Sequence, residues 1–133
     1  MINSPSTDFL IRIKNGYRAG RKTIKAPFSR YCESIAGLLQ KHNLIENYNI
    51  TDNEGKKEIS LKLKYNNRQP VVYDVKLFSK PGRRLYEKAS SLPWGVTPNS
   101  LIIISTSQGL MSQKEATAKR LGGEVVAELY LYV

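Results

Sequence analysis

Two segments in the first half of the chain carry apolar residues at the spacing of an amphipathic helix. The first stripe consists of Phe9, Leu10, Ile13 and Tyr17, and the second of Tyr31, Ile35, Leu38, Leu39 and His42. Such residues fall on one side of a helix, because each turn takes three to four residues. Ser4 and Ser29 are expected to cap the two helices, and the first helix should end near Gly16 to Gly20.

The segments that follow have the two-residue period of strands with one buried face. From Glu58 to Tyr65, apolar side chains alternate with serine and lysine, and residues 52–55 form a turn that connects this segment to Ile45–Thr51. We therefore expect a β-hairpin with one solvent-exposed, basic face. Lys22–Ala26 is predicted to be a shorter strand, ended by Pro27.

Three segments in the second half also have the pattern of strands: Val71–Phe78, Leu101–Ile104 and Glu124–Val133. The middle one is wholly apolar and mostly β-branched, as in a strand buried on both faces. Together the elements predict an α/β (α+β) fold of two small lobes. The N-terminal lobe, residues 1–66, should have the order α-β-α-β-β. The C-terminal lobe, residues 67–133, should be mainly β with a short capped helix.

A cluster of hydroxyl side chains follows the buried strand directly. It consists of Ser105, Thr106 and Ser107, and Gly109 follows as the residue that lets the backbone turn sharply. Ser112 and Glu115 have capping-box spacing, so a helix is expected to begin beside the cluster and to run to Arg120, with Leu121-Gly122-Gly123 ending it. Hydroxyls and free backbone N–H groups at a helix start can bind phosphate, ribose or a base edge. Any one of these residues fits a cap or turn equally well, but three together favour a binding site.

The formal net charge of +10 points to a polyanionic partner. The excess is +6 before residue 66 and +4 after it, so both halves carry it. Seven basic residues and no acidic one lie between Phe9 and Cys32: Arg12, Lys14, Arg18, Arg21, Lys22, Lys25 and Arg30. Solvated faces commonly mix both signs, so this run favours phosphate contact.

A second basic segment precedes an aromatic residue. Lys80, Arg83 and Arg84 flank a Pro-Gly pair that favours a type II turn, and Tyr86 follows. Basic side chains next to an aromatic ring are common in RNA-binding proteins, where they contact the backbone and stack on bases. Burial of Tyr86 in the core fits the sequence equally well. The single tryptophan, Trp94, is expected to pack between elements.

Several classes of function are disfavoured. Cys32 and His42 are the only residues of their kinds, so a disulfide within the chain or a Cys/His zinc site is not expected. The chain lacks G-x-S-x-G and G-x-x-x-x-G-K-[ST], which argues against an enzyme with a nucleophile or phosphate site at the serine and threonine residues. No enzymatic activity, cofactor, metal or small-molecule substrate is expected. No apolar run approaches the ~20 residues of a membrane span, and no signal peptide is apparent, so a soluble protein is expected.

Four stretches, in this order, carry a resemblance to a known family. They are Asp8-Phe-Leu-Ile-Arg-Ile-Lys-Asn-Gly16, Ser79-Lys-Pro-Gly-Arg-Arg-Leu-Tyr86, Ser105-Thr-Ser-Gln-Gly-Leu-Met111 and Gly122-Gly-Glu124. As an ordered set they resemble the signatures of the family of small-subunit ribosomal protein eight. The resemblance covers residues 4 to 130. Gln108 departs from the common pattern, in which lysine is frequent.

The resemblance implies a two-lobed protein that binds the central domain of small-subunit ribosomal RNA and supports subunit assembly and translation. The residues that match the family's RNA contacts are Ser105, Thr106, Ser107 and Gly109 at a minor groove, Tyr86 after the basic turn, and Arg12, Lys14 and Asn15 on the first helix. Neighbouring small-subunit proteins and, in bacterial members, a similar messenger RNA hairpin are the further expected partners. Both a cytoplasmic and an organellar ribosome fit. The alternative is an architectural protein that binds DNA or RNA without specificity. Such a protein explains the net charge equally well.

Overall fold

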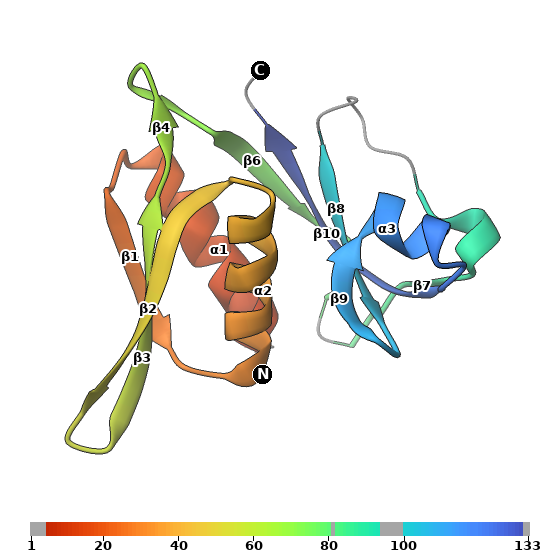
Figure 1. The fold of residues 1–133 in the computed structure, drawn as a ribbon, viewed down its shortest axis with the longest axis horizontal. Helices are drawn as coiled ribbons and strands as arrows, with labels where there is room; N and C mark the ends of the chain where they lie inside the picture. Colours follow the sequence, from red (N-terminus) through yellow and green to blue (C-terminus); the bar gives the residue numbers. More distant parts are fainter. Residues whose placement is uncertain (1–4, 81, 94–99, 132–133) are drawn as a thin grey trace. The chain divides into compact units, whose positions relative to one another are not determined.

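Helices α1 (Pro5–Arg18) and α2 (Arg30–Lys41) pack on each other and on a three-stranded sheet in the first part of the chain (Figure 1). The structure is a computed structural model that describes residues 5–80, 82–93 and 100–131. Its described residues form two units, Pro5–Tyr73 and Asp74–Leu131. None of the helices within these ranges is both long and apolar enough to cross a membrane.

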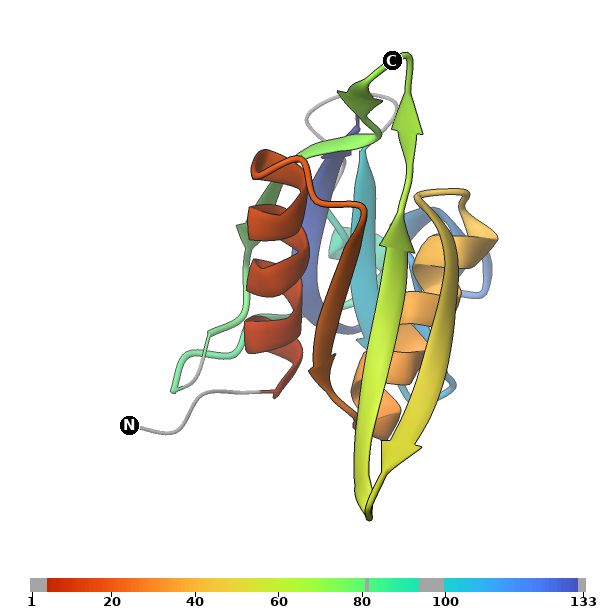
Figure 2. The same cartoon turned by 90° about the vertical axis from the view of Figure 1, so that its left-hand side faces the viewer.

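The sheet of the first unit is antiparallel, with β3 (Lys56–Leu63) between β1 (Thr23–Pro27) and β2 (Ile45–Asn53). Figure 2 shows β2 and β3 as one long hairpin with β1 alongside β3. Ile24 pairs with Leu61, and both are buried because the helices cover the face to which they point. The predicted alternation and hairpin are confirmed.

Local contacts explain where the first unit's elements begin and join. The Ser29 hydroxyl accepts a hydrogen bond from the Cys32 N–H at 3.0 Å, which confirms the predicted cap of α2. Ser4 lies outside the described residues. Burial raises the pKa of Tyr17 to about 12, so the phenol stays protonated; it donates to the Leu44 carbonyl and accepts from the Lys64 N–H. The small hairpin of β4 (Tyr65–Asn66) and β5 (Gln69–Pro70) was not predicted.

The second unit is built on a five-stranded sheet. Its order is β6 (Val72–Leu77), β10 (Gly123–Leu131), β8 (Leu101–Thr106) and β9 (Gly109–Ser112), and β7 (Tyr86–Glu87) pairs with β10. The short helix α3 (Gln113–Ala118) and a 3₁₀ turn (Ala89–Ser91) complete it. The core cluster consists of Ile102, Ile104, Met111, Ala116 and Val125. All four residues of Leu101–Ile104 are buried, as predicted.

Three predictions for the second unit need correction. The sequence suggested that the hydroxyl cluster runs into a helix, but β9 lies between them and pairs with β8. The helix ends at Ala118 rather than at Arg120, which itself adopts the left-handed conformation with φ of +57°. Gly122 and Gly123 therefore do not supply the helix stop. They are required because backbone atoms lie where their Cβ atoms would be. Trp94 lies outside the described residues.

Candidate nucleic-acid interface

The hydroxyl cluster forms the tip of the β8–β9 hairpin. Thr106 pairs with Gly109 at the tip, whereas Ile103 pairs with Ser112 at the far end, where α3 begins. These two pairs are about 10 Å apart along the strands. The helix N-terminus is therefore not beside the hydroxyls, and the predicted contribution of free helical N–H groups is wrong. The Ser112 hydroxyl does accept from the Glu115 N–H, which confirms that part of the capping box.

The three hydroxyls have different surroundings. Thr106 Oγ1 donates to the Gly109 carbonyl at 2.9 Å and accepts from the Gln108 N–H at 3.1 Å, so it fixes the shape of the turn. Ser107 is exposed and has no hydrogen-bond partner among the described residues. Ser105 is half-buried on the strand, and its side chain points to the face opposite that of Thr106.

Strand register brings Tyr86 close to this hairpin. Glu124 on β10 pairs with Tyr86 on β7 and with Ser105 on β8, so the three residues form one row across the sheet. Paired residues point to the same face, and adjacent strands lie about 4.8 Å apart, which places Tyr86 and Ser105 roughly 10 Å from each other. Tyr86 is 67% exposed, and of the two alternatives left by the sequence the structure selects the exposed ring.

The basic segment before Tyr86 is a tight turn attached to β10. The backbones of Lys80 and Arg83 exchange two hydrogen bonds, and Gly82 has a φ of +79°. Ser79 is buried; its hydroxyl donates to the Val125 carbonyl at 2.8 Å and accepts from the Leu85 N–H at 3.0 Å. Sequence reasoning missed this role of Ser79, because a serine at the start of a turn gives no signal of a long-range contact.

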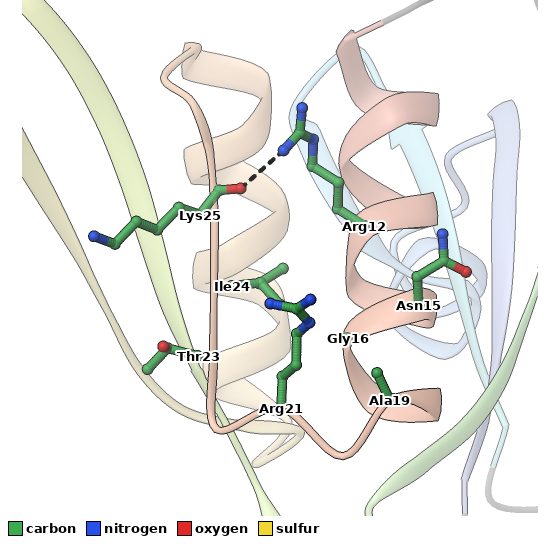
Figure 3. Close-up of a pocket in the computed structure, with 8 residues that line it drawn as sticks. All are labelled: Arg12, Asn15, Gly16, Ala19, Arg21, Thr23, Ile24 and Lys25. Carbon is green, nitrogen blue, oxygen red and sulfur yellow. Dashed lines mark hydrogen bonds between the residues drawn. The ribbon is translucent and has the colours of Figure 1, made fainter.

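The first unit carries a separate basic groove between α1 and β1 (Figure 3). Its volume is about 590 Å³, and it is lined by Arg12, Asn15, Gly16, Ala19, Arg21, Thr23, Ile24 and Lys25. Arg12 is held in place by Asp8, at 3.1 Å, and by the Lys25 carbonyl, to which it donates at 3.1 Å. Of the predicted helix residues, Arg12 and Asn15 line this groove and Lys14 does not.

The structure therefore defines a small, basic α+β protein with an exposed ring and hydroxyls on one unit and an arginine-lined groove on the other. The family model described as Ribosomal protein S8 matches residues 4–130. The chain belongs to the ribosomal protein S8 family, which confirms the resemblance stated above.

Curated relatives agree over nearly the full length. The protein named small ribosomal subunit protein uS8 from Mycoplasmopsis pulmonis is 36% identical over 130 residues, with 98% of each chain covered. Proteins of the same name from Wigglesworthia glossinidia brevipalpis and Corynebacterium glutamicum (strain R) are each 38% identical. These alignments cover 94% and 97% of this chain and 95% and 98% of the relatives.

Proposed function

We propose that the chain is a structural constituent of the small ribosomal subunit that binds directly to the central domain of its ribosomal RNA and supports assembly and translation. The observation that carries this proposal is the row in which Tyr86 and Ser105 share one face of the sheet, beside the exposed Ser107. Family membership supports the same role. We infer a ribosomal location, neighbouring small-subunit proteins as partners and no enzymatic activity.

The chemistry of the interface suits an irregular RNA helix. A-form RNA has a deep major groove and presents 2′-hydroxyls and base edges in a wide, shallow minor groove. The short hydroxyls of Ser105 and Ser107 can reach this groove, and Tyr86 offers a ring on which a base can stack. Affinity would come mainly from phosphate contacts of Lys80, Arg83 and the groove of the first unit. In this proposal the second unit reads the RNA. A messenger RNA hairpin of similar shape would bind in the same way.

A competition experiment separates this function from non-specific binding driven by net charge. We expect small-subunit ribosomal RNA to bind at physiological salt in the presence of a large excess of duplex DNA, because the minor grooves of A-form and B-form helices differ in width and in 2′-hydroxyls. Equal competition by duplex DNA would instead support the architectural alternative, in which charge alone drives binding.

Ser107→Ala should weaken binding to ribosomal RNA by about 1 kcal/mol. This is the lower end of the range for leaving a partner without its hydrogen bond, because water can reach the exposed position. Filter binding at constant salt measures the change. Gln108→Ala, which changes the next residue in the chain, is the control. If Ser107→Ala binds as tightly as the wild type, Ser107 does not belong to the interface.

Arg12→Ala should lower the dependence of binding on salt, reducing the slope of log K against log salt by about 0.7 to 0.9. The fold should be little affected, because the ion pair with Asp8 is half-exposed and such pairs contribute only about 0.5 kcal/mol. Titrations at several salt concentrations give the slope. A slope equal to that of the wild type would show that Arg12 does not contact phosphate.

A further inference from the structure

The row across the sheet of the second unit contains an acidic side chain at its centre. Glu124 lies between Tyr86 and Ser105, on the strand that separates them, and its side chain points to the same face. A carboxylate on a surface that binds RNA opposes binding, because it repels the phosphates. Its presence among groups suited to contact RNA therefore requires a reason.

The contacts of Glu124 leave one of its oxygens available. Oε2 forms an ion pair with Nη1 of Arg84 at 3.3 Å, and the side chain of Glu124 is only 17% exposed. Oε1 has no hydrogen-bond partner among the described residues. Every buried side-chain oxygen in the described part of the chain has a partner, so an oxygen without one cannot be buried. Oε1 is therefore open to solvent on the face that carries Tyr86 and Ser105.

We propose that Glu124 determines specificity by accepting a hydrogen bond from the 2-amino group of a guanine in the bound RNA. This inference rests on the proposed function, because it assumes that the face with Tyr86 and Ser105 contacts a minor groove. A carboxylate can only accept hydrogen bonds. In the minor groove the bases offer acceptors, apart from the guanine amino group, which is their one donor.

The ion pair with Arg84 makes this role compatible with a polyanionic partner. Arg84 offsets the negative charge of Glu124 and also holds the carboxylate against the sheet, so that little side-chain freedom is lost on binding. Hydrogen bonds to a charged acceptor are about twice as strong as neutral ones. A single contact of this kind can therefore discriminate guanine from other bases while the surrounding cations supply affinity.

Neutralising Glu124 should weaken RNA binding if Glu124 accepts a hydrogen bond from guanine. It should leave RNA binding unchanged or strengthen it if Glu124 only neutralises Arg84. We expect Glu124→Gln to weaken binding to the small-subunit ribosomal RNA encoded in the same genome by roughly tenfold or more. Binding to a scrambled transcript of equal length should be unchanged or tighter, because a repulsive charge has been removed. If Glu124 only neutralises Arg84, the variant should bind both transcripts equally well or better, which would overturn the proposal.

Two control variants separate specificity from charge and position. Glu87→Gln removes the same charge from the neighbouring β7 position, which points to the opposite face of the sheet, and should leave the ratio of the two affinities unchanged. Arg84→Gln removes a positive charge and also the partner that holds Glu124, so it should weaken binding to both transcripts, and to ribosomal RNA more strongly. Glu124→Asp, which keeps the charge but shortens the side chain, should also lose the preference for ribosomal RNA. Thermal unfolding establishes that each variant is folded.

Analogue interference on the RNA identifies the donor. Ribosomal RNA carrying sparse inosine, which lacks only the 2-amino group, should bind the wild type poorly when inosine occupies one particular guanine position. This interference should disappear with Glu124→Gln. Interference only from 2′-deoxy substitutions would mean that Glu124 accepts from a ribose hydroxyl and would overturn the guanine assignment.

The same measurements distinguish failure of the proposed function from failure of the role assigned to Glu124. If the wild type binds the scrambled transcript as tightly as ribosomal RNA, the proposed function itself fails. If the wild type prefers ribosomal RNA and Glu124→Gln retains that preference, only the role of Glu124 fails.

Discussion

Tyr86→Ala is expected to weaken binding to small-subunit ribosomal RNA by about 1 to 3 kcal/mol, roughly five- to 150-fold, which is the range for loss of one base stacked on an aromatic ring. The ring is 67% exposed and contributes little to the core, so the free energy of unfolding should change by less than about 0.5 kcal/mol. Binding titrations together with urea denaturation measure the two quantities.

Tyr86→Phe is the matched control for this variant. It keeps the ring and removes only the hydroxyl, so most of the affinity should remain if stacking is the main contribution. Equal losses for Ala and Phe would instead assign the contact to the hydroxyl, and no loss for Ala would remove Tyr86 from the interface.

Gly123→Ala is expected to destabilise the second unit by about 3 kcal/mol and to reduce RNA binding with it. A Cβ at position 123 would lie 2.1 Å from the carbonyl oxygen of Ser105, and this backbone atom cannot move without disturbing the pairing of β10 with β8. The same displacement would change the positions of Ser105 and Glu124. Urea denaturation and RNA titration of the variant test both effects.

Gly37→Ala provides the control for the glycine substitution. Gly37 lies in α2, where the nearest atom to an added Cβ, Tyr48 Oη, is 3.9 Å away. Alanine should therefore stabilise the helix by roughly 0.5 to 1 kcal/mol and leave RNA binding unchanged. A Gly123→Ala protein as stable as the wild type would contradict the close approach of the two strands.

Local patterns in the sequence were sufficient for the main elements of the first unit, although not for the small β4–β5 hairpin. The helices α1 and α2, the cap at Ser29 and the β2–β3 hairpin each depend on residues that are close in the chain. Their apolar periodicity and turn residues therefore identify them without knowledge of the fold.

The second unit was predicted less well, because its arrangement depends on contacts between distant residues. β9 is four residues long and ends at a helix cap, so its apolar residues were too few to show a strand beside the signal of the helix. The row of Tyr86, Glu124 and Ser105 joins three separate strands. Register of this kind is set by packing of the whole sheet, and no local pattern reveals it.

The proposed function requires that the tip of the β8–β9 hairpin contact one site in ribosomal RNA. Its most direct test is to replace Ser107 with a photo-crosslinking amino acid in the full-length chain, irradiate it with total cellular RNA, and sequence the RNA that is attached. We predict that the crosslinks concentrate at one region of the central domain of small-subunit ribosomal RNA. Crosslinks spread over many RNAs in proportion to their abundance would rule out a single site for the tip of the hairpin.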